Sequence, residues 1–201
     1  MQRNGLLNVG TANPYPLYTG TLALNDPLSD NSNGYFWVES NDSGGGCGFS
    51  GSAYHIYVSQ LTSNHYCPAG VTNFSNFTYQ VQMTVVRGDA GGIVFRIDDA
   101  NQSDYYFRIG IDGSYALDIY KDNSFVSNLT SGSNTVINTG LNQSNLLAVV
   151  ANGSNIILYV NNQQLASVSD STYSQGEIGM VASSFSNPAE AVFTNAKVWT
   201  F

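Results

Sequence analysis

The chain has 201 residues, of which 42% are hydrophobic and only 10% are charged. The hydrophobic content supports a packed core and excludes a disordered chain, and the length suits one domain. Six Lys and Arg face fourteen Asp and Glu, for a net charge of −8. That charge excludes the basic surface that nucleic acids and anionic membranes require, so we expect no nucleic-acid partner.

Membrane insertion is not expected either, because the longest apolar run, 146–151, is far shorter than the roughly 20 residues of a spanning helix. Residues 1–10 contain no apolar signal-peptide core. The protein is therefore either cytosolic or exported by a segment that this chain lacks.

The first 52 residues are expected to form an irregular N-terminal arm. Three prolines and a glycine run at 44–46 interrupt this part of the chain, and two short strands are expected, near 22–24 and 35–38. The main strands lie in 53–201, so we expect a single β-sandwich domain over 1–201.

Two cysteines, Cys47 and Cys67, flank the apolar stretch 53–58. Their spacing does not match a zinc motif. They either form a disulfide, which would contribute about 3 kcal/mol by restricting the unfolded chain, or remain as buried free thiols. We favour the disulfide. Together with the polar, uncharged composition, which is familiar in exported bacterial proteins, it predicts an extracytoplasmic location.

From residue 77 onward, apolar and polar residues alternate with the period of two that is typical of half-buried β-strands. Asp-Gly and Asn-Gly pairs between these segments supply the positive φ angles of tight hairpins. Many short antiparallel strands predict an all-β sandwich or barrel. The expected strands are 77–86, 93–98, 104–111, 115–120, 125–129, 146–151, 156–161, 164–168, 178–182 and 191–199.

Five segments occur in a characteristic order: 91–96 (GGIVFR), 105–109 (YYFRI), 156–161 (IILYVN), 170–179 (DSTYSQGEIG) and 191–199 (AVFTNAKVW). In order and spacing they resemble the concanavalin A-like lectin/glucanase superfamily, closest to its laminin G-like and keto-disaccharide hydrolase-like branches. The resemblance covers about residues 74–201. It implies a jelly-roll β-sandwich of two curved antiparallel sheets, with a concave face that often binds glycans. It does not define an activity, because these branches include binders, adhesins and enzymes.

The same alternation predicts a polar sheet face. If the apolar residues of these strands point into the core, the opposite face carries the candidate ligand-binding residues Arg96, Asp98, Tyr106, Arg108, Asp118 and Tyr120, joined by Gln80 and Gln82 from the preceding strand. Aromatic rings that pack on sugar rings, with planar polar groups that bind hydroxyls, are suited to sugar recognition. The alternative is a solvated face with cross-strand pairs such as Arg108 with Asp118.

No catalytic residue is assigned. Retaining glucanases of this superfamily carry the pattern Glu-x-Asp-x-x-Glu, and none of the three glutamates, at positions 39, 177 and 190, begins it. Of the two histidines, His55 is expected to be structural and His65 to lie in a surface loop.

The segment 98–104 offers alternating oxygen donors in Asp99, Asn101 and Ser103, but it lacks the glycine and glutamate of an EF-hand loop. A polar turn is expected there, with no cofactor. Calcium is common in the superfamily, so the resemblance leaves a structural calcium ion open.

These features favour an extracytoplasmic, non-catalytic carbohydrate-binding or sensor module, whose partner is a carbohydrate or a cell-surface glycan and whose site is the concave sheet face. Two alternatives remain open. One is an adhesive or scaffold domain that binds protein. The other is a glycoside hydrolase or lyase of the keto-disaccharide type, with carboxylates drawn from Asp98, Asp112 or Asp118.

Overall fold

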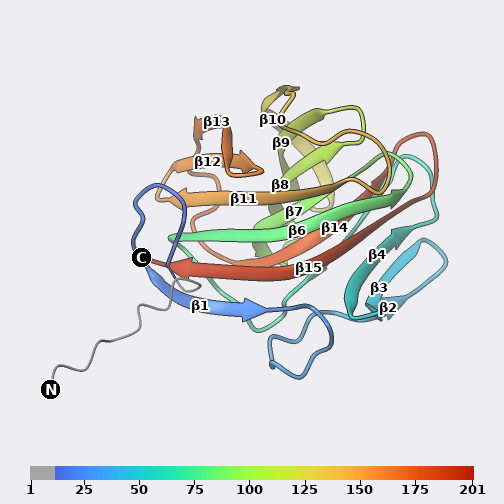
Figure 1. Ribbon diagram of the computed structural model, residues 1–201, viewed down its shortest axis with the longest axis horizontal. Coiled ribbons are helices and arrows are strands. Elements are labelled where there is room, and N and C mark those ends of the chain that lie inside the picture. Colours follow the sequence, from blue (N-terminus) through green and yellow to red (C-terminus); the bar gives the residue numbers. More distant parts are fainter. Residues whose placement is uncertain (1–11) are drawn as a thin grey trace, which may run out of the picture.

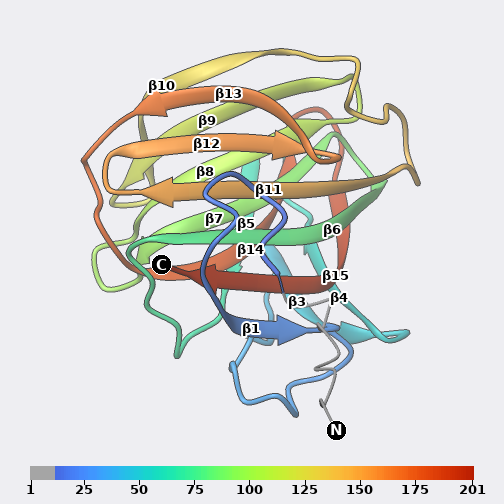
Figure 2. The same ribbon diagram turned by 60° about the vertical axis from the view of Figure 1, so that its left-hand side comes forward.

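Two antiparallel β-sheets packed face to face form the computed structural model, which describes residues 12–201 (Figure 1). The nine-stranded sheet has the order β13-β12-β11-β6-β15-β4-β3-β2, with β1 beside β15, and the six-stranded sheet has the order β10-β9-β8-β7-β14-β5. Figure 2 shows the two layers from a second direction. The strands are β1 (Thr21–Asp26), β2 (Ser40–Asn41), β3 (Gly45–Ser50), β4 (Ala53–Val58), β5 (Ser63–Pro68), β6 (Phe77–Arg87), β7 (Ala90–Asp98), β8 (Ser103–Gly110), β9 (Ser114–Lys121), β10 (Ser124–Ser133), β11 (Ser144–Asn152), β12 (Asn155–Val160), β13 (Gln163–Ser169), β14 (Glu177–Ser184) and β15 (Ala189–Thr200).

The core lies between the sheets and follows the predicted alternation. In β6, every second residue is buried, from Phe77 to Val85, and these side chains belong to the same cluster as Phe95 of β7 and Phe107 of β8. Fully burying a large apolar side chain contributes about 1.5–3 kcal/mol. This shared cluster therefore holds the two sheets together. No helix among residues 12–201 is long and apolar enough to cross a membrane.

All ten strands expected after residue 77 are present, with ends that differ by a few residues. The predictions were less accurate in the N-terminal part. The strand near 22–24 is confirmed as β1, but 35–38 contains only an isolated bridge at Trp37, because Phe36 adopts a positive φ of 53°. Residues 1–10, in which the sequence contains no apolar signal-peptide core, lie outside the described residues.

The glycine-rich segment that we expected to be irregular is instead part of the nine-stranded sheet, as β2 and β3. Its glycines are needed for close packing: a Cβ on Gly46 would lie 2.4 Å from the Ser40 carbonyl oxygen. A composition that normally marks a loop here permits a tightly paired edge.

Cys47 and Cys67 form the expected disulfide, which excludes the alternative of two free thiols. Cys47 lies in β3 of the nine-stranded sheet and Cys67 lies in β5 of the six-stranded sheet. The bond therefore joins the two sheets covalently at the edge where β5 ends the smaller one.

Candidate functional site

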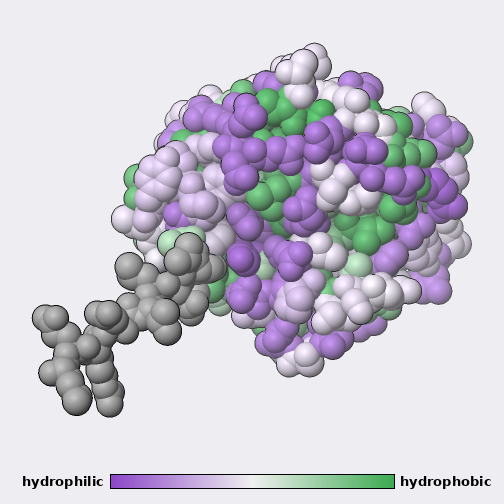
Figure 3. All heavy atoms as spheres, viewed as in Figure 1, coloured by the Kyte–Doolittle hydropathy of each residue, from purple (hydrophilic) through white to green (hydrophobic). Residues whose placement is uncertain are grey.

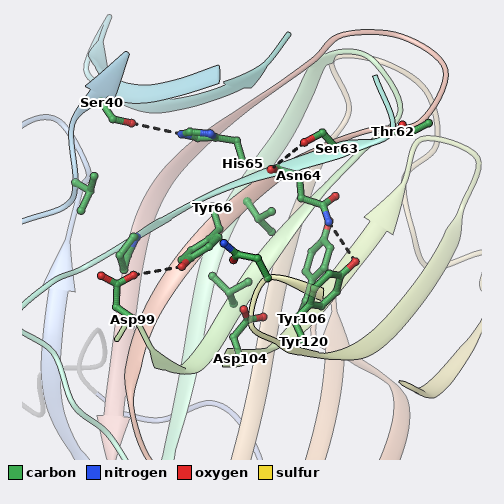
Figure 4. Close-up of a pocket in the computed structure, with 15 residues that line it drawn as sticks. Ser40, Thr62, Ser63, Asn64, His65, Tyr66, Asp99, Asp104, Tyr106 and Tyr120 are labelled. Carbon is green, nitrogen blue, oxygen red and sulfur yellow. Dashed lines mark hydrogen bonds between the residues drawn. The ribbon is translucent and has the colours of Figure 1, made fainter. Parts of the chain in front are cut away.

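A cavity of about 660 Å³ lies on the outer face of the six-stranded sheet (Figure 4). Its floor is built by Val94 of β7, Tyr106 of β8, Tyr120 of β9 and Val181 of β14, and Tyr66 of β5 stands beside them. These side chains alternate with residues that point into the core, so the pleat of the sheet places them on the outer face. Strand β5 and the chain at 38–40 add the polar wall.

Among the described residues, the segment before β1 lines no part of this cavity. Tyr15 packs instead on Ala148 and Val150 of β11 and on the ring of Tyr159 of β12, with ring centroids 5.0 Å apart. Those strands belong to the nine-stranded sheet. Figure 3 shows hydrophilic and hydrophobic residues intermingled over the face seen in Figure 1.

The tyrosines of the cavity are held by a hydrogen-bond network. The amide of Asn64 donates to the Tyr120 hydroxyl at 3.2 Å, and the hydroxyl of Ser183 donates to the Asn64 carbonyl oxygen at 2.7 Å. The same Ser183 hydroxyl bonds to the Tyr106 hydroxyl. With the ring centroids of Tyr106 and Tyr120 6.0 Å apart, the aromatic surface is fixed in place without a ligand.

Two aspartates line the cavity, one buried and one exposed. Asp104 begins the outward series of β8, pairs in register with Tyr120, and is only 5% exposed. Its Oδ1 has no hydrogen-bond partner within residues 12–201, and burial raises its pKa to about 7. Asp99 is exposed and accepts a hydrogen bond from the Tyr66 hydroxyl at 3.2 Å. The cavity therefore contains one solvated carboxylate and one buried carboxyl group that lacks a donor.

His65 lies in the wall of this cavity rather than in the surface loop that we expected. It belongs to β5 and is half-buried, and its Nε2 lies 3.4 Å from the Ser40 hydroxyl. Burial lowers its pKa and the nearby Asp42 only partly opposes this, so the ring is neutral at pH 7. Its ring nitrogen and the two cysteine sulfurs lie within 4.8 Å of one another, but disulfide sulfurs are not thiolate ligands.

The structure brings four of the predicted site residues onto this outer face. Tyr106 and Tyr120 line the cavity. Arg108 and Asp118 lie next to it as the expected cross-strand pair, with 3.3 Å between Arg108 Nε and Asp118 Oδ2. Asp118 also accepts a bond from Asn128, and the Arg108 guanidinium lies 5.3 Å from the centre of the Phe185 ring. Both charges therefore have protein partners.

Arg96 was wrongly placed on this face. A β-bulge separates Phe95 from Asp98 in the pairing with β8, and Arg96 itself has a φ of 52°. The bulge shifts the alternation by one residue, so Ile97 joins the outer cluster although we expected it in the core. Arg96 is 1% exposed and donates to the carbonyl oxygens of Ser75, Gly153 and Tyr173 at 2.8–2.9 Å. It ties three loops together.

Gln82 and Asp98 also lie elsewhere. Gln82, like Gln80, is in β6 of the nine-stranded sheet, where its amide donates to the Ser144 hydroxyl at 2.6 Å. The prediction failed because it assumed that consecutive strands share a sheet, whereas β6 and β7 lie in opposite layers. Asp98 accepts bonds from Asn101 and stabilises the turn before β8.

The carboxylates of the alternative hydrolase prediction do not form a pair. Asp98 and Asp112 lie beyond opposite ends of β8, whose eight residues span roughly 25 Å. Paired glycosidase carboxyls are about 5 to 9.5 Å apart. Asp118 is 3% exposed and already bound by Arg108 and Asn128.

Sequence reasoning missed the wall residues Asn64 and Tyr66 and the buried Asp104. Asp104 was detectable, because it stands two residues before Tyr106 and so shares its face. Strand β5 was not detectable: its sequence, SNHYCP, has no apolar alternation. It pairs with β14 through its backbone, and the disulfide fixes its end.

No family model matches the sequence, and no curated protein matches it. Solved structures show the fold. A carbohydrate-binding module, CBM66 from Bacillus subtilis, is similar with a TM-score of 0.68 and 18% identity over 82% of this chain and 95% of that one. A protein of unknown function with a galectin-like fold from the same organism has a TM-score of 0.65 and 13% identity, over 90% and 96%. A Bacillus licheniformis β-glucanase has a TM-score of 0.61 and 11% identity, over 91% and 99%. The expected concanavalin A-like jelly roll is thus confirmed as the fold.

Proposed function

We propose that this protein is a non-catalytic carbohydrate-binding module and that the cavity on its six-stranded sheet is the glycan site. The observation that carries the proposal is a cavity with a tyrosine floor and a wall of hydrogen-bonding side chains. The apolar faces of sugar rings pack on aromatic rings, and sugar hydroxyls need donors and acceptors at the edges. Tyr66 and Tyr120 are partly exposed and supply the first, with the buried Tyr106 ring beneath them, while Asn64 and Asp99 supply the second.

Pre-organisation supports the proposal. The Tyr106 and Tyr120 side chains are held by Asn64 and Ser183 before any ligand arrives. A site that is already ordered loses less side-chain entropy on binding. The fold is shared with a carbohydrate-binding module, a galectin-like protein and a glucanase, which is in keeping with a glycan ligand.

The proposal includes an extracytoplasmic location. Its support is the disulfide between Cys47 and Cys67, since such bonds persist mainly in oxidising compartments.

A glycan array followed by calorimetry tests the function. Tyr120→Ala removes one ring from the cavity floor, and we expect it to weaken binding of the best array ligand by tenfold or more. Tyr18→Ala is the matched control, because Tyr18 is 70% exposed and lies outside the cavity. Equal affinities for the Tyr120→Ala and wild-type proteins would contradict the assigned site. If the wild-type protein bound no glycan on the array, this would contradict glycan binding and favour the protein-binding alternative.

One observation favours a second candidate, glycoside hydrolysis. Asp104 is buried with a pKa raised to about 7, and it shares the cavity with the exposed Asp99. A carboxyl group whose pKa is raised by burial is suited to act as a general acid. Turnover of the array ligand that disappears in both Asp104→Asn and Asp99→Asn would establish this activity. Binding without turnover would establish the non-catalytic module.

A further inference from the structure

Acidic side chains line the cavity without a compensating cation among the described residues. Asp99 and Asp104 line it, and no lysine or arginine among residues 12–201 does so. Arg108, on the same sheet face, is bound to Asp118. Glu177 adds to the negative potential at the Tyr66 hydroxyl, whose pKa is raised by burial and by Asp99, Asp104 and Glu177. His65 is held neutral by burial.

Asp104 adds a specific requirement to this general potential. It is only 5% exposed, it lines the cavity, and its Oδ1 has no partner within the described part of the chain. A buried carboxyl without a hydrogen bond is unfavourable, and a donor placed beside it recovers that loss. Figure 4 shows Asp104 below Tyr66 and beside Tyr106 and Tyr120, so that a donor reaching it lies among aromatic rings.

We infer that the cavity selects glycans that carry a free primary amine, such as unacetylated hexosamines. This inference rests on the proposed glycan-binding function and names its ligand class. The ammonium group favours the ionised form of Asp104 and donates to it in a charge-assisted hydrogen bond, while the rings of Tyr66 and Tyr120 attract the cation electrostatically. N-acetylation removes the charge and adds bulk. A neutral hydroxyl at the same position donates only an uncharged bond.

The acidic lining of the cavity also disfavours one class of ligands. Uronic, sialic and sulfated sugars bring an anion to a site that contains Asp99 and Asp104 and no free cation among the lining residues described. Like charges repel, and this repulsion is strongest in a cavity from which water is partly excluded. We therefore expect the cavity to bind cationic sugars most tightly, neutral sugars less tightly and anionic sugars least.

Titrations of matched sugars test the inference. The probes are the methyl glycosides of glucosamine and galactosamine, of their N-acetylated forms, and of the neutral parents glucose and galactose. Each is tested as the α and as the β anomer. Within the gluco series and within the galacto series the probes differ only in the group at C2, and NMR measures weak binding by each. We expect the amine to bind at least about tenfold more tightly than the hydroxyl or the acetamide, the difference that a charge-assisted bond supplies over a neutral one.

Two variants complete the test. Asp104→Asn keeps the shape of the side chain and cannot ionise, so we expect the amine and the neutral parent sugar to bind this variant with equal affinity. Asp30→Asn makes the same change at an exposed turn outside the cavity and should leave the preference intact. If neutral sugars bind the wild-type protein as tightly as amines, the amine selectivity is overturned while glycan binding stands. If no sugar binds, both are overturned.

Discussion

At the scale of single residues, two buried charged groups on the six-stranded sheet have opposite roles. Arg96 donates from Nη1 and Nη2 to three carbonyl oxygens of the protein, and only its Nε lacks a partner within residues 12–201, whereas Asp104 leaves an oxygen without a donor inside the cavity. The first arrangement stabilises the fold, and the second costs stability that a ligand recovers. Sequence alternation found neither role, because a one-residue bulge inverted the face at Arg96 and because burial cannot be read from an aspartate in a polar segment.

The stability cost of Asp104 has a defined pH dependence. Its folded pKa of about 7 lies above the ordinary value of 3.8, so the protonated form is favoured in the fold. The associated stability is complete below about pH 4 and is lost as the pH rises through 7. At about 1.4 kcal/mol per pKa unit, the loss is on the order of 4 kcal/mol.

Chemical unfolding of wild type and Asp104→Asn from pH 4 to pH 8 measures this loss. The difference in unfolding free energy between the two proteins should shift in favour of the variant as the pH rises. A difference that is constant with pH would show that Asp104 does not titrate abnormally.

Replacing Arg96 tests its assignment to the fold. Arg96→Ala removes a charged donor from the carbonyl oxygens of Ser75, Gly153 and Tyr173 and leaves a cavity, so we expect a loss of about 3 kcal/mol or more in unfolding free energy. Arg87→Ala, at an exposed position, should change it by no more than about 0.5 kcal/mol. The folded fraction of Arg96→Ala should bind the array ligand normally. Loss of binding by fully folded Arg96→Ala protein would show that Arg96 contributes to the ligand site.

At the scale of elements, strand β5 forms one wall of the cavity. It supplies Asn64, His65 and Tyr66, and it lies at the edge of its sheet, with β14 as its only strand partner among residues 12–201. The disulfide connects its Cys67 to β3 of the opposite sheet. An edge strand of polar sequence is therefore held by backbone pairing on one side and a covalent bond across the core.

Removing the disulfide should affect stability and binding together. The double variant Cys47→Ser/Cys67→Ser opens a loop with a sequence separation of 20, which corresponds to a loss of about 3 kcal/mol in the chain-entropy model. We also expect faster amide hydrogen exchange in β5 and weaker glycan binding. Unchanged exchange in β5 with unchanged affinity would show that the strand is positioned without the bond.

The elements also show where sequence reasoning reached its limit. The strands from β6 to β15 follow apolar alternation and hairpin turns, and both signals are local. Strands β2, β3 and β5 form through glycine packing, backbone pairing and a long-range disulfide. The glycines of β2 and β3 resemble those of a loop, and the partners of β5 are distant in the chain, so local sequence patterns predict neither. The part of the cavity wall that β5 supplies could not be predicted for that reason.

At the scale of the whole molecule, the net charge of −8 and the charge of the cavity act in the same direction. The field of an acidic protein lowers the local concentration of anionic ligands, most strongly at low ionic strength. We expect oligogalacturonate and sulfated glycans to show no binding in 20 mM buffer. An anionic glycan that binds there and is displaced by salt would contradict the charge assigned to the site.

The central claim is that glycans bind on the outer face of the six-stranded sheet. Amide chemical-shift mapping with the best array ligand tests it most directly, because it locates the contact without altering the protein. The account predicts saturable shifts concentrated at Asn64–Tyr66, Asp104–Tyr106 and Tyr120, with the strands β11 to β13 of the nine-stranded sheet unmoved. Shifts confined to the nine-stranded sheet or to the N-terminal segment around Tyr15 would contradict it.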